Sequence, residues 1–330
     1  MRTSLLLALL LALNTSCITV LADHTLRTKS ESFPASGVDA AILKTGAGTL
    51  TITGMPDLSS IEVRAEFKSR SGFSGNDQRT LDNLQLDMEV RGNTFYLKTD
   101  HRSNWNWGDS GWIDISIDMP AGIELDVDDG SGPLSISGMD RNIKVKDGSG
   151  EIELTRNNGS IDINDGSGGI RVRNAQGDVD INDGSGSIDL RYLGGNVRIQ
   201  DGSGSIHVDD VGGNLVISGD GSGEIRVQNI QRDVDIHDGS GSIHVEQVGE
   251  NVSIQDESGS IDVLQANGNV FIHDGSGSIH VRHAGGNVQI HDGSGSIDAD
   301  DVGGDLIIPS AGSGSLHYSD VRGKVSVPNR

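Results

Sequence analysis

The chain has 330 residues and a formal net charge of −23, from 48 acidic and 25 basic residues. Only 3% of its residues are aromatic, whereas 47 are glycine. This composition excludes a conventional globular core of that size, which needs more large side chains. The negative charge repels phosphate backbones and so makes nucleic acid a poor partner.

Residues 1–22 are predicted to be an export signal that is removed after Ala22. An arginine precedes an apolar run from Leu5 to Leu13, and small and polar residues follow it. The run is too short to span a bilayer, and no later segment approaches the length of a membrane span. We therefore expect a periplasmic, cell-envelope or secreted protein. Cys17, the only cysteine, is an alternative lipid-anchor site within this segment.

Residues 23–128 are predicted to form an irregular, β-rich capping region. Alternating apolar residues indicate a hairpin over residues 84–99 and a further strand over residues 113–117. The segment KTGAGTLTITG, residues 44–54, resembles half of the repeat that follows. It predicts that stacking begins there and is interrupted.

Three tryptophans, Trp105, Trp107 and Trp112, lie in the motif NWNWGDSGW. Tryptophan rings beside Asn and Asp are suited to holding sugar rings, so the motif is a candidate ligand contact. In the alternative that we favour, the rings cover the open end of the repeat array, where unpaired strands need protection.

Residues 129–330 form an array of eleven units, each of which begins with DGSG or a close variant. The units recur every 18 residues, with one extra residue in the fifth and tenth intervals. Each unit holds two apolar alternations of period two and two Gly-rich corners, which indicates two short strands and two turns. Two strands cannot bury a face alone, so the units are predicted to stack. The fold class is therefore all-β, a parallel β-solenoid roughly 50 Å long.

One side of each strand is expected to face the interior and the other to face solvent. The predicted inward residues of one coil are Ile188, Leu190, Leu193, Val197 and Ile199. The outward position of the first strand mostly alternates between acids and Arg or His from coil to coil, and opposite charges at inter-strand distance stabilise each other. These positions are Glu153, Arg171, Asp189, His207, Arg226, His244, Asp262, His280, Asp298 and His317.

The aspartate of DGSG is predicted to recur as a column in an exposed corner, where it accepts N–H groups from the following Gly-Ser-Gly. A calcium ladder on these carboxylates is an alternative. It is disfavoured because the calcium-binding nonapeptide has Asp where this repeat has Ile. The candidate ligands of that ladder are Asp147, Asp165, Asp183, Asp201, Asp220, Asp238, Asp256, Asp274 and Asp292.

No catalytic residue and no cofactor are predicted. A nucleophile or base must be singular and activated, whereas the Ser and His residues here recur from unit to unit.

The stretch IDISIDMPAGIELDVDDGSGPLSISG, residues 113–138, resembles the bacterial putative-adhesin β-strand-repeat family of exported envelope proteins, whose domain has no known function. The resemblance runs from about Ser32 to the end of the chain. It implies an exported, non-enzymatic β-solenoid and brings no catalytic residues with it. The DGSG array of this chain is longer and more regular than is usual in that family.

The predicted function is structural or adhesin-like binding to a surface, a polysaccharide or a protein. One alternative is a rod of cation-binding repeats. Another is a β-helical enzyme that acts on acidic polysaccharide, which would need a groove with unrepeated acidic or basic residues.

Overall fold

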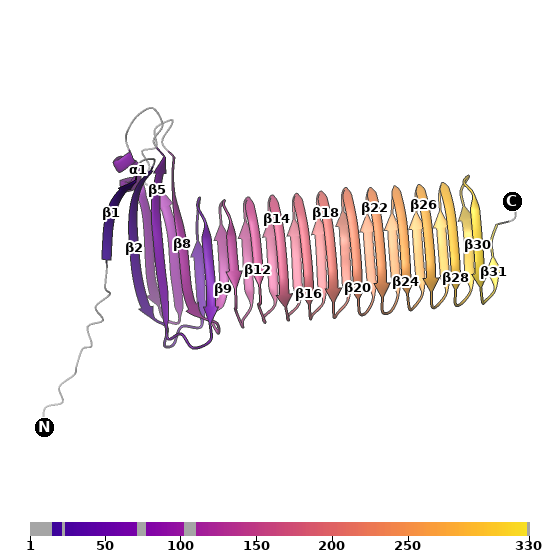
Figure 1. The fold of residues 1–330 in the computed structure, drawn as a ribbon, viewed down its shortest axis with the longest axis horizontal. Coiled ribbons are helices and arrows are strands. Elements are labelled where there is room, and N and C mark those ends of the chain that lie inside the picture. Colours follow the sequence, from indigo (N-terminus) through magenta and orange to yellow (C-terminus); the bar gives the residue numbers. More distant parts are fainter. Residues whose placement is uncertain (1–14, 22–23, 71–76, 102–109, 329–330) are drawn as a thin grey trace, which may run out of the picture.

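The computed structural model describes residues 15–21, 24–70, 77–101 and 110–328, which form a long rod of stacked strands with a broader N-terminal end (Figure 1). Two sheets run the length of the rod, and apart from one short helix the described secondary structure is all β. The predicted parallel β-solenoid, with coils of 18 residues, is confirmed.

The first sheet, called sheet A here, has 16 strands. In spatial order they are β1 (Thr15–Leu21), β2 (His24–Pro34), β5 (Ser60–Arg70), β8 (Ser110–Pro120), β4 (Leu50–Met55), β10 (Leu134–Ser137), β12 (Gly150–Thr155), β14 (Gly168–Ala175), β16 (Gly186–Leu193), β18 (Gly204–Val211), β20 (Gly223–Ile230), β22 (Gly241–Val248), β24 (Gly259–Ala266), β26 (Gly277–Ala284), β28 (Gly295–Val302) and β30 (Leu316–Val321).

The second sheet, called sheet B, has 15 strands. In spatial order they are β6 (Leu84–Arg91), β7 (Thr94–His101), β3 (Ala40–Lys44), β9 (Glu124–Asp129), β11 (Ile143–Asp147), β13 (Ile161–Asp165), β15 (Val179–Asp183), β17 (Val197–Asp201), β19 (Leu215–Asp220), β21 (Val234–Asp238), β23 (Val252–Asp256), β25 (Val270–Asp274), β27 (Val288–Asp292), β29 (Leu306–Ala311) and β31 (Val325–Ser326).

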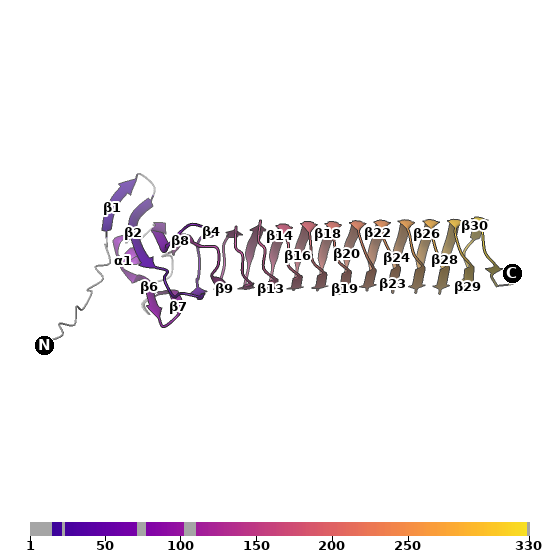
Figure 2. The same cartoon turned by 90° about the horizontal axis from the view of Figure 1, so that it is seen from below.

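Most coils place each residue directly beside its counterpart in the next repeat. Ile188 of β16 lies opposite Ile206 of β18, and Val197 of β17 lies opposite Leu215 of β19. The five inward residues expected for the coil of β16 and β17 are all buried, with at most 3% of their surface exposed. Stacked in this way, the Ile, Val and Leu side chains form one continuous core. Figure 2 shows the two sheets facing each other along the rod.

A bulge near the end of each long sheet A strand explains why two inward residues are three positions apart. Tyr192 lies between the buried Leu190 and Leu193 and adopts a φ of 60°. This left-handed conformation is uncommon for residues other than glycine, and it turns the following side chain back into the core. The same conformation recurs in ten successive coils.

The two extra residues of the array are absorbed inside sheet B. The pairing of β19 with β21 shifts between Ile217 and Asp220, and that of β27 with β29 shifts between Gln289 and His291. The core positions on either side of each shift keep their places. An insertion therefore makes a local irregularity without displacing the stack.

The N-terminal part of the chain thickens one end of the rod (Figures 1 and 2). β2, β5 and β8 pair antiparallel in sheet A, and β6 and β7 form the predicted hairpin. The helix α1 (Asp77–Asn83) buries Leu81 completely. Phe67 and Phe95 are buried as well, and Phe33 packs on Phe95 with ring centroids 5.2 Å apart. Phenylalanines thus build the apolar centre of this end.

The half-repeat expected at residues 44–54 takes its place in the stack. β4 pairs in parallel with β10, and β3 pairs in parallel with β9. The chain then forms β5–β8, of which β7 and β8 pair in parallel with β3 and β4, and it returns to the other side of β3 at β9. Strands from before residue 129 therefore continue the repeat towards the N-terminal end.

The second glycine of DGSG is required by both its backbone angle and its neighbours. Gly204 has a φ of 145°, and a Cβ atom on it would lie 1.5 Å from the carbonyl oxygen of Gly186 in the preceding coil. A side chain there would collide with backbone, which cannot move without breaking the ladder. This position repeats along the rod as a column of glycines.

We expect Gly204→Ala to lower the free energy of unfolding by about 3 kcal/mol or more, because the new Cβ forces coils apart and strains the backbone. Urea denaturation followed by circular dichroism measures the change. Gly219→Ala is the matched control, since a Cβ there meets no atom within 4 Å. Equal losses in the two variants would contradict the steric argument.

Candidate functional site

The aspartates of the DGSG motifs lie inside the rod. Each is the last residue of its sheet B strand, and between 2% and 6% of its surface is exposed. The expectation of an exposed corner is therefore wrong. The inward alternation of Val197 and Ile199 simply continues for one more step and points the carboxyl group of Asp201 into the interior.

The two oxygens of each buried carboxyl group differ in their contacts. From Asp147 onward, Oδ1 accepts the backbone N–H of the serine two residues later, at 2.9–3.3 Å. Asp129 instead accepts the hydroxyl of Thr45. In the nine members from Asp129 to Asp274, Oδ2 is buried and has no hydrogen-bond partner. One oxygen thus caps the turn while the other is unsatisfied.

Burial raises the pKa of the carboxyl groups from Asp129 to Asp274, and in most of them the charge of a nearby aspartate raises it further. For Asp147, Asp183, Asp220 and Asp256 the pKa rises to about 6. Two ionised carboxylates in adjacent coils, about 4.8 Å apart, repel by about 3.5 kcal/mol at an effective dielectric constant of about 20. The backbone N–H groups of the corner oppose the shift but do not cancel it.

The geometry of the aspartate column bears on the predicted calcium ladder. In the described residues no group of three or more His, Cys, Asp or Glu side chains is arranged to hold a metal ion. Calcium takes six to eight oxygen ligands, whereas each coil from Asp129 to Asp274 offers one oxygen without a partner to the column. The calcium ladder therefore gains no support from this geometry.

A second column, on the surface, is a ladder of asparagines and aspartates that precedes the sheet B strands. The side-chain oxygen of Asn269 accepts the backbone N–H of Asn287 at 2.9 Å, and its amide donates to Asn251 Oδ1 at 3.1 Å. Equivalent bonds join most coils from Asn142 to Lys324. The recurring Gly-Gly-Asn motif marks this ladder in the sequence. The ladder becomes visible only when the motifs of successive coils are aligned with one another.

The outward charges of sheet A face one another as predicted. Arg171 lies between Glu153 and Asp189, and Asp262 lies between His244 and His280. The carboxylate of Asp189 forms ion pairs with the guanidinium groups of Arg191 at 2.7 Å and of Arg173 at 3.1 Å. These side chains form ion pairs on an open strand face and do not converge on a pocket.

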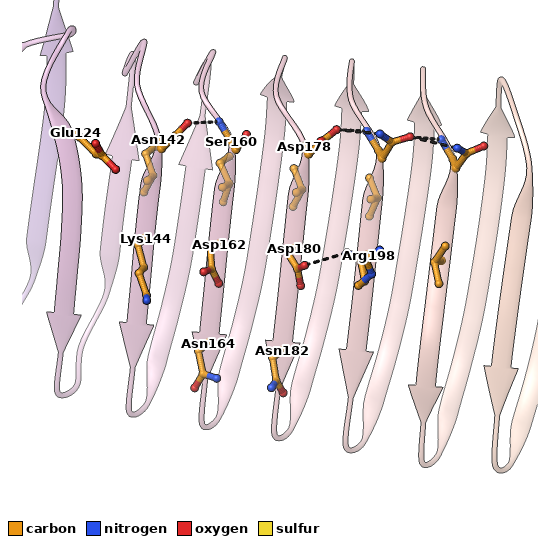
Figure 3. A pocket seen from close by; sticks show the side chains of 17 residues that line it. Glu124, Asn142, Lys144, Ser160, Asp162, Asn164, Asp178, Asp180, Asn182 and Arg198 are labelled. Atoms are coloured by element: carbon orange, nitrogen blue, oxygen red, sulfur yellow. Dashed lines mark hydrogen bonds and ion pairs between the residues drawn. The ribbon is translucent and has the colours of Figure 1, made fainter.

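An elongated groove lies on the outer face of sheet B over β11–β19 (Figure 3). Its volume is about 850 Å³, and rows of polar side chains from successive coils line it. Lys144, Asp162, Asp180 and Arg198 form the middle row, in which Arg198 pairs with Asp180 at 3.3 Å. Asn164 and its counterpart Asn182 form the row below. The groove is open along the rod, so it suits an extended ligand.

A smaller groove of about 510 Å³ follows the corner of left-handed residues. The side chains of Asn229, Gln247, Gln265 and His283 contribute to its lining. The sequence gives little sign of this corner, because residues of many types occupy the position.

The remaining predicted site residues are spread over the N-terminal region. Trp112 lies in β8, opposite Lys68 of β5, and is partly buried. Trp105 and Trp107 lie outside the described residues. The backbone of Cys17 lies in β1, opposite Thr28 of β2. The ligand-contact and lipid-anchor roles stay predictions.

Residues 106–214 match the model of the Toastrack DUF4097 family. This segment is similar to that family, and the resemblance to the putative-adhesin repeat proteins is confirmed. The Toastrack segment contains β8–β18 and therefore includes most of the sheet B groove. No curated protein matches the chain.

Several solved structures are similar to the chain. A putative adhesin from Parabacteroides merdae is 14% identical, with 89% of this chain and 96% of that chain covered and a TM-score of 0.32. A putative lipid binding protein from Parabacteroides distasonis is 18% identical, with 88% and 96% covered and a TM-score of 0.27. A putative cell adhesion protein from Clostridium sporogenes is 15% identical, with 72% and 99% covered and a TM-score of 0.24.

No helix among the described residues is long and apolar enough to cross a membrane.

We expect Asn269→Ala to lower the free energy of unfolding by about 1 kcal/mol, because the N–H of Asn287 loses its acceptor. Asn269→Asp keeps the acceptor, as Asp233 does in its own coil, and should cost less. Urea denaturation of the two variants separates them. An equal loss would mean that the acceptor oxygen does not stabilise the stack.

Proposed function

We propose that the protein is an exported, non-enzymatic, adhesin-like rod that binds a hydroxyl-rich polysaccharide along the outer face of sheet B. The groove of about 850 Å³ over β11–β19 carries this proposal, because its lining comes from successive coils. Adjacent coils are about 4.8 Å apart, so a polymer laid along the rod meets a similar row of side chains at each step.

The chemistry of the groove favours a neutral polymer. Amide and carboxylate groups such as those of Asn164, Asn182 and Asp162 hydrogen-bond to sugar hydroxyls, and Lys144 and Arg198 add further donors. The net charge of −23 opposes polyanions.

A binding role also fits the distribution of titratable groups. In the part of the chain that the structure describes, the buried ionisable side chains are the ten aspartates of the DGSG column, and these repeat from coil to coil. An enzyme that acts on acidic polysaccharide would need unrepeated acid and base groups converging on a groove. Turnover of uronate polymers by the purified protein would contradict the non-enzymatic proposal.

Export to the cell envelope rests on residues 1–22, with their basic start, short apolar run and small residues before position 23. Mass spectrometry of the N-terminus of protein purified from its own host would identify cleavage after Ala22, or lipidation at Cys17.

We expect the triple variant Asp162→Ala, Asp180→Ala, Arg198→Ala to weaken polysaccharide binding by about tenfold or more, because it removes charged hydrogen-bonding groups from the groove. A glycan array identifies the bound polymer, and titration calorimetry measures its affinity. Removing Asp180 together with Arg198 leaves neither partner of that pair unmatched.

The control is Asp262→Ala, Arg282→Ala, Asp298→Ala, which makes the same charge change on sheet A. It should bind like the unaltered protein. Equal affinity of the groove variant and the unaltered protein would overturn the proposed binding face.

The tryptophan motif provides a separate test of the ligand contact. If its rings hold sugar, Trp105→Ala, Trp107→Ala should weaken binding to the same polymer by about tenfold, through loss of ring stacking. Unchanged affinity would remove the tryptophans from the binding site and leave the groove proposal standing.

A further inference from the structure

The aspartate column is the one buried ionisable feature that the proposed function does not use. Its members lie side by side in register, Asp129 beside Asp147, Asp147 beside Asp165 and Asp165 beside Asp183. The pairing continues from Asp220 to Asp292. Only between Asp201 and Asp220 does the irregularity of β19 interrupt it.

The column has no buried cation to neutralise it. Among the residues that the structure describes, no Lys, Arg or His side chain is buried. The groups that act on each carboxyl group are mainly the aspartates of the adjacent coils, together with Asp128 beside Asp129 and His273 beside Asp274. The core side chains of both sheets that share this interior are apolar.

A proton satisfies the unpartnered oxygen where a metal ion does not fit. Protonation of Oδ2 removes the charge and turns a buried acceptor without a partner into a donor. The carboxylate of the adjacent coil, which lies beside it in register, is an acceptor for that donor. When two carboxyl groups share a site, one retains a proton far above the usual range.

We propose that the interior aspartate column is a proton-binding site, in which alternate coils hold a proton and share it with the coils beside them, so that acid strengthens the rod and alkali weakens it. This regulation is independent of the polysaccharide groove.

The raised pKa values give the sign of the effect. The four members whose pKa rises to about 6, namely Asp147, Asp183, Asp220 and Asp256, are every second residue of the column. Because these values lie above the ordinary 3.8, the folded rod binds more protons than the unfolded chain. The stabilisation is complete below that ordinary value and is lost as the pH rises through about 6.

The test compares thermal unfolding of the full chain at about pH 5 and about pH 8. We expect the melting temperature to fall by about 10 °C or more between them. The variant Asp147→Asn, Asp183→Asn, Asp220→Asn, Asp256→Asn keeps each turn-capping oxygen and puts a permanent donor in place of Oδ2. It should melt higher than the unaltered protein at about pH 8 and lose at least about half of the pH dependence.

The control variant Asp57→Asn, Asp87→Asn, Asp126→Asn, Asp162→Asn removes four negative charges from exposed positions. It should keep the pH dependence of the unaltered protein. If it flattens the profile as much as the column variant does, general charge repulsion explains the effect and the proposal fails. The proposal also fails if the column variant keeps the unaltered pH dependence.

A measurement on the unaltered protein guards against a column variant that does not fold. Infrared spectroscopy separates protonated carboxyl groups from carboxylates, and we expect protonated carboxyl groups to persist at about pH 6, well above their ordinary pKa. Their absence at that pH would overturn the proposal. So would a rise in melting temperature at about pH 8 with calcium chloride that a chelator reverses, because the column would then be a cation site.

Discussion

The structure depends on the parallel backbone ladder that joins each coil to the next. Every strand from β11 to β29 in sheet B and from β12 to β30 in sheet A pairs with strands that lie one coil away along the chain. Because the step between parallel strands is about 4.8 Å, whatever occupies a position of the repeat is held beside its own counterpart. Each position of the repeat therefore favours a side chain that packs well against its counterparts in the adjacent coils.

Most positions meet this constraint in a simple way. Isoleucine and valine stack into a continuous core, and glycine fills the corner where a Cβ atom would strike the backbone of the preceding coil. Asparagine stacks because its side-chain oxygen accepts a hydrogen bond from the backbone N–H of the next coil. On the outer face of sheet A, acids and bases mostly alternate, so that most neighbours attract.

The aspartate column meets the constraint least well, which is why it is informative. Its Oδ1 atoms cap the DGSG turns, a local benefit that recurs in every coil, but the inward direction brings like charges together without counter-ions. Under the proposed sharing of protons, the turn caps are kept and the repulsion between neighbouring carboxylates is relieved. The proposed binding face and the proposed proton-binding column thus lie in different parts of the molecule: the first on the outer surface of sheet B, the second in the interior between the sheets.

The sequence by itself determined the coil length, the two strands per coil, the inward residues and the facing charges of sheet A, because a fixed period with period-two alternation admits few other arrangements. The sequence also indicates that Asp201 is buried, because Asp201 continues the alternation of Val197 and Ile199. The glycine-rich corner that follows Asp201 obscures this pattern. Only the tertiary structure decided the left-handed bulge at Tyr192 and the return of the chain from β8 to β9. It also decided that β3 and β4 lie against β9 and β10. The positions of β3, β4 and the return to β9 depend on contacts between segments that are far apart in the chain. The bulge depends on a left-handed backbone angle that residues of many types adopt at this position, so the residue type does not predict it.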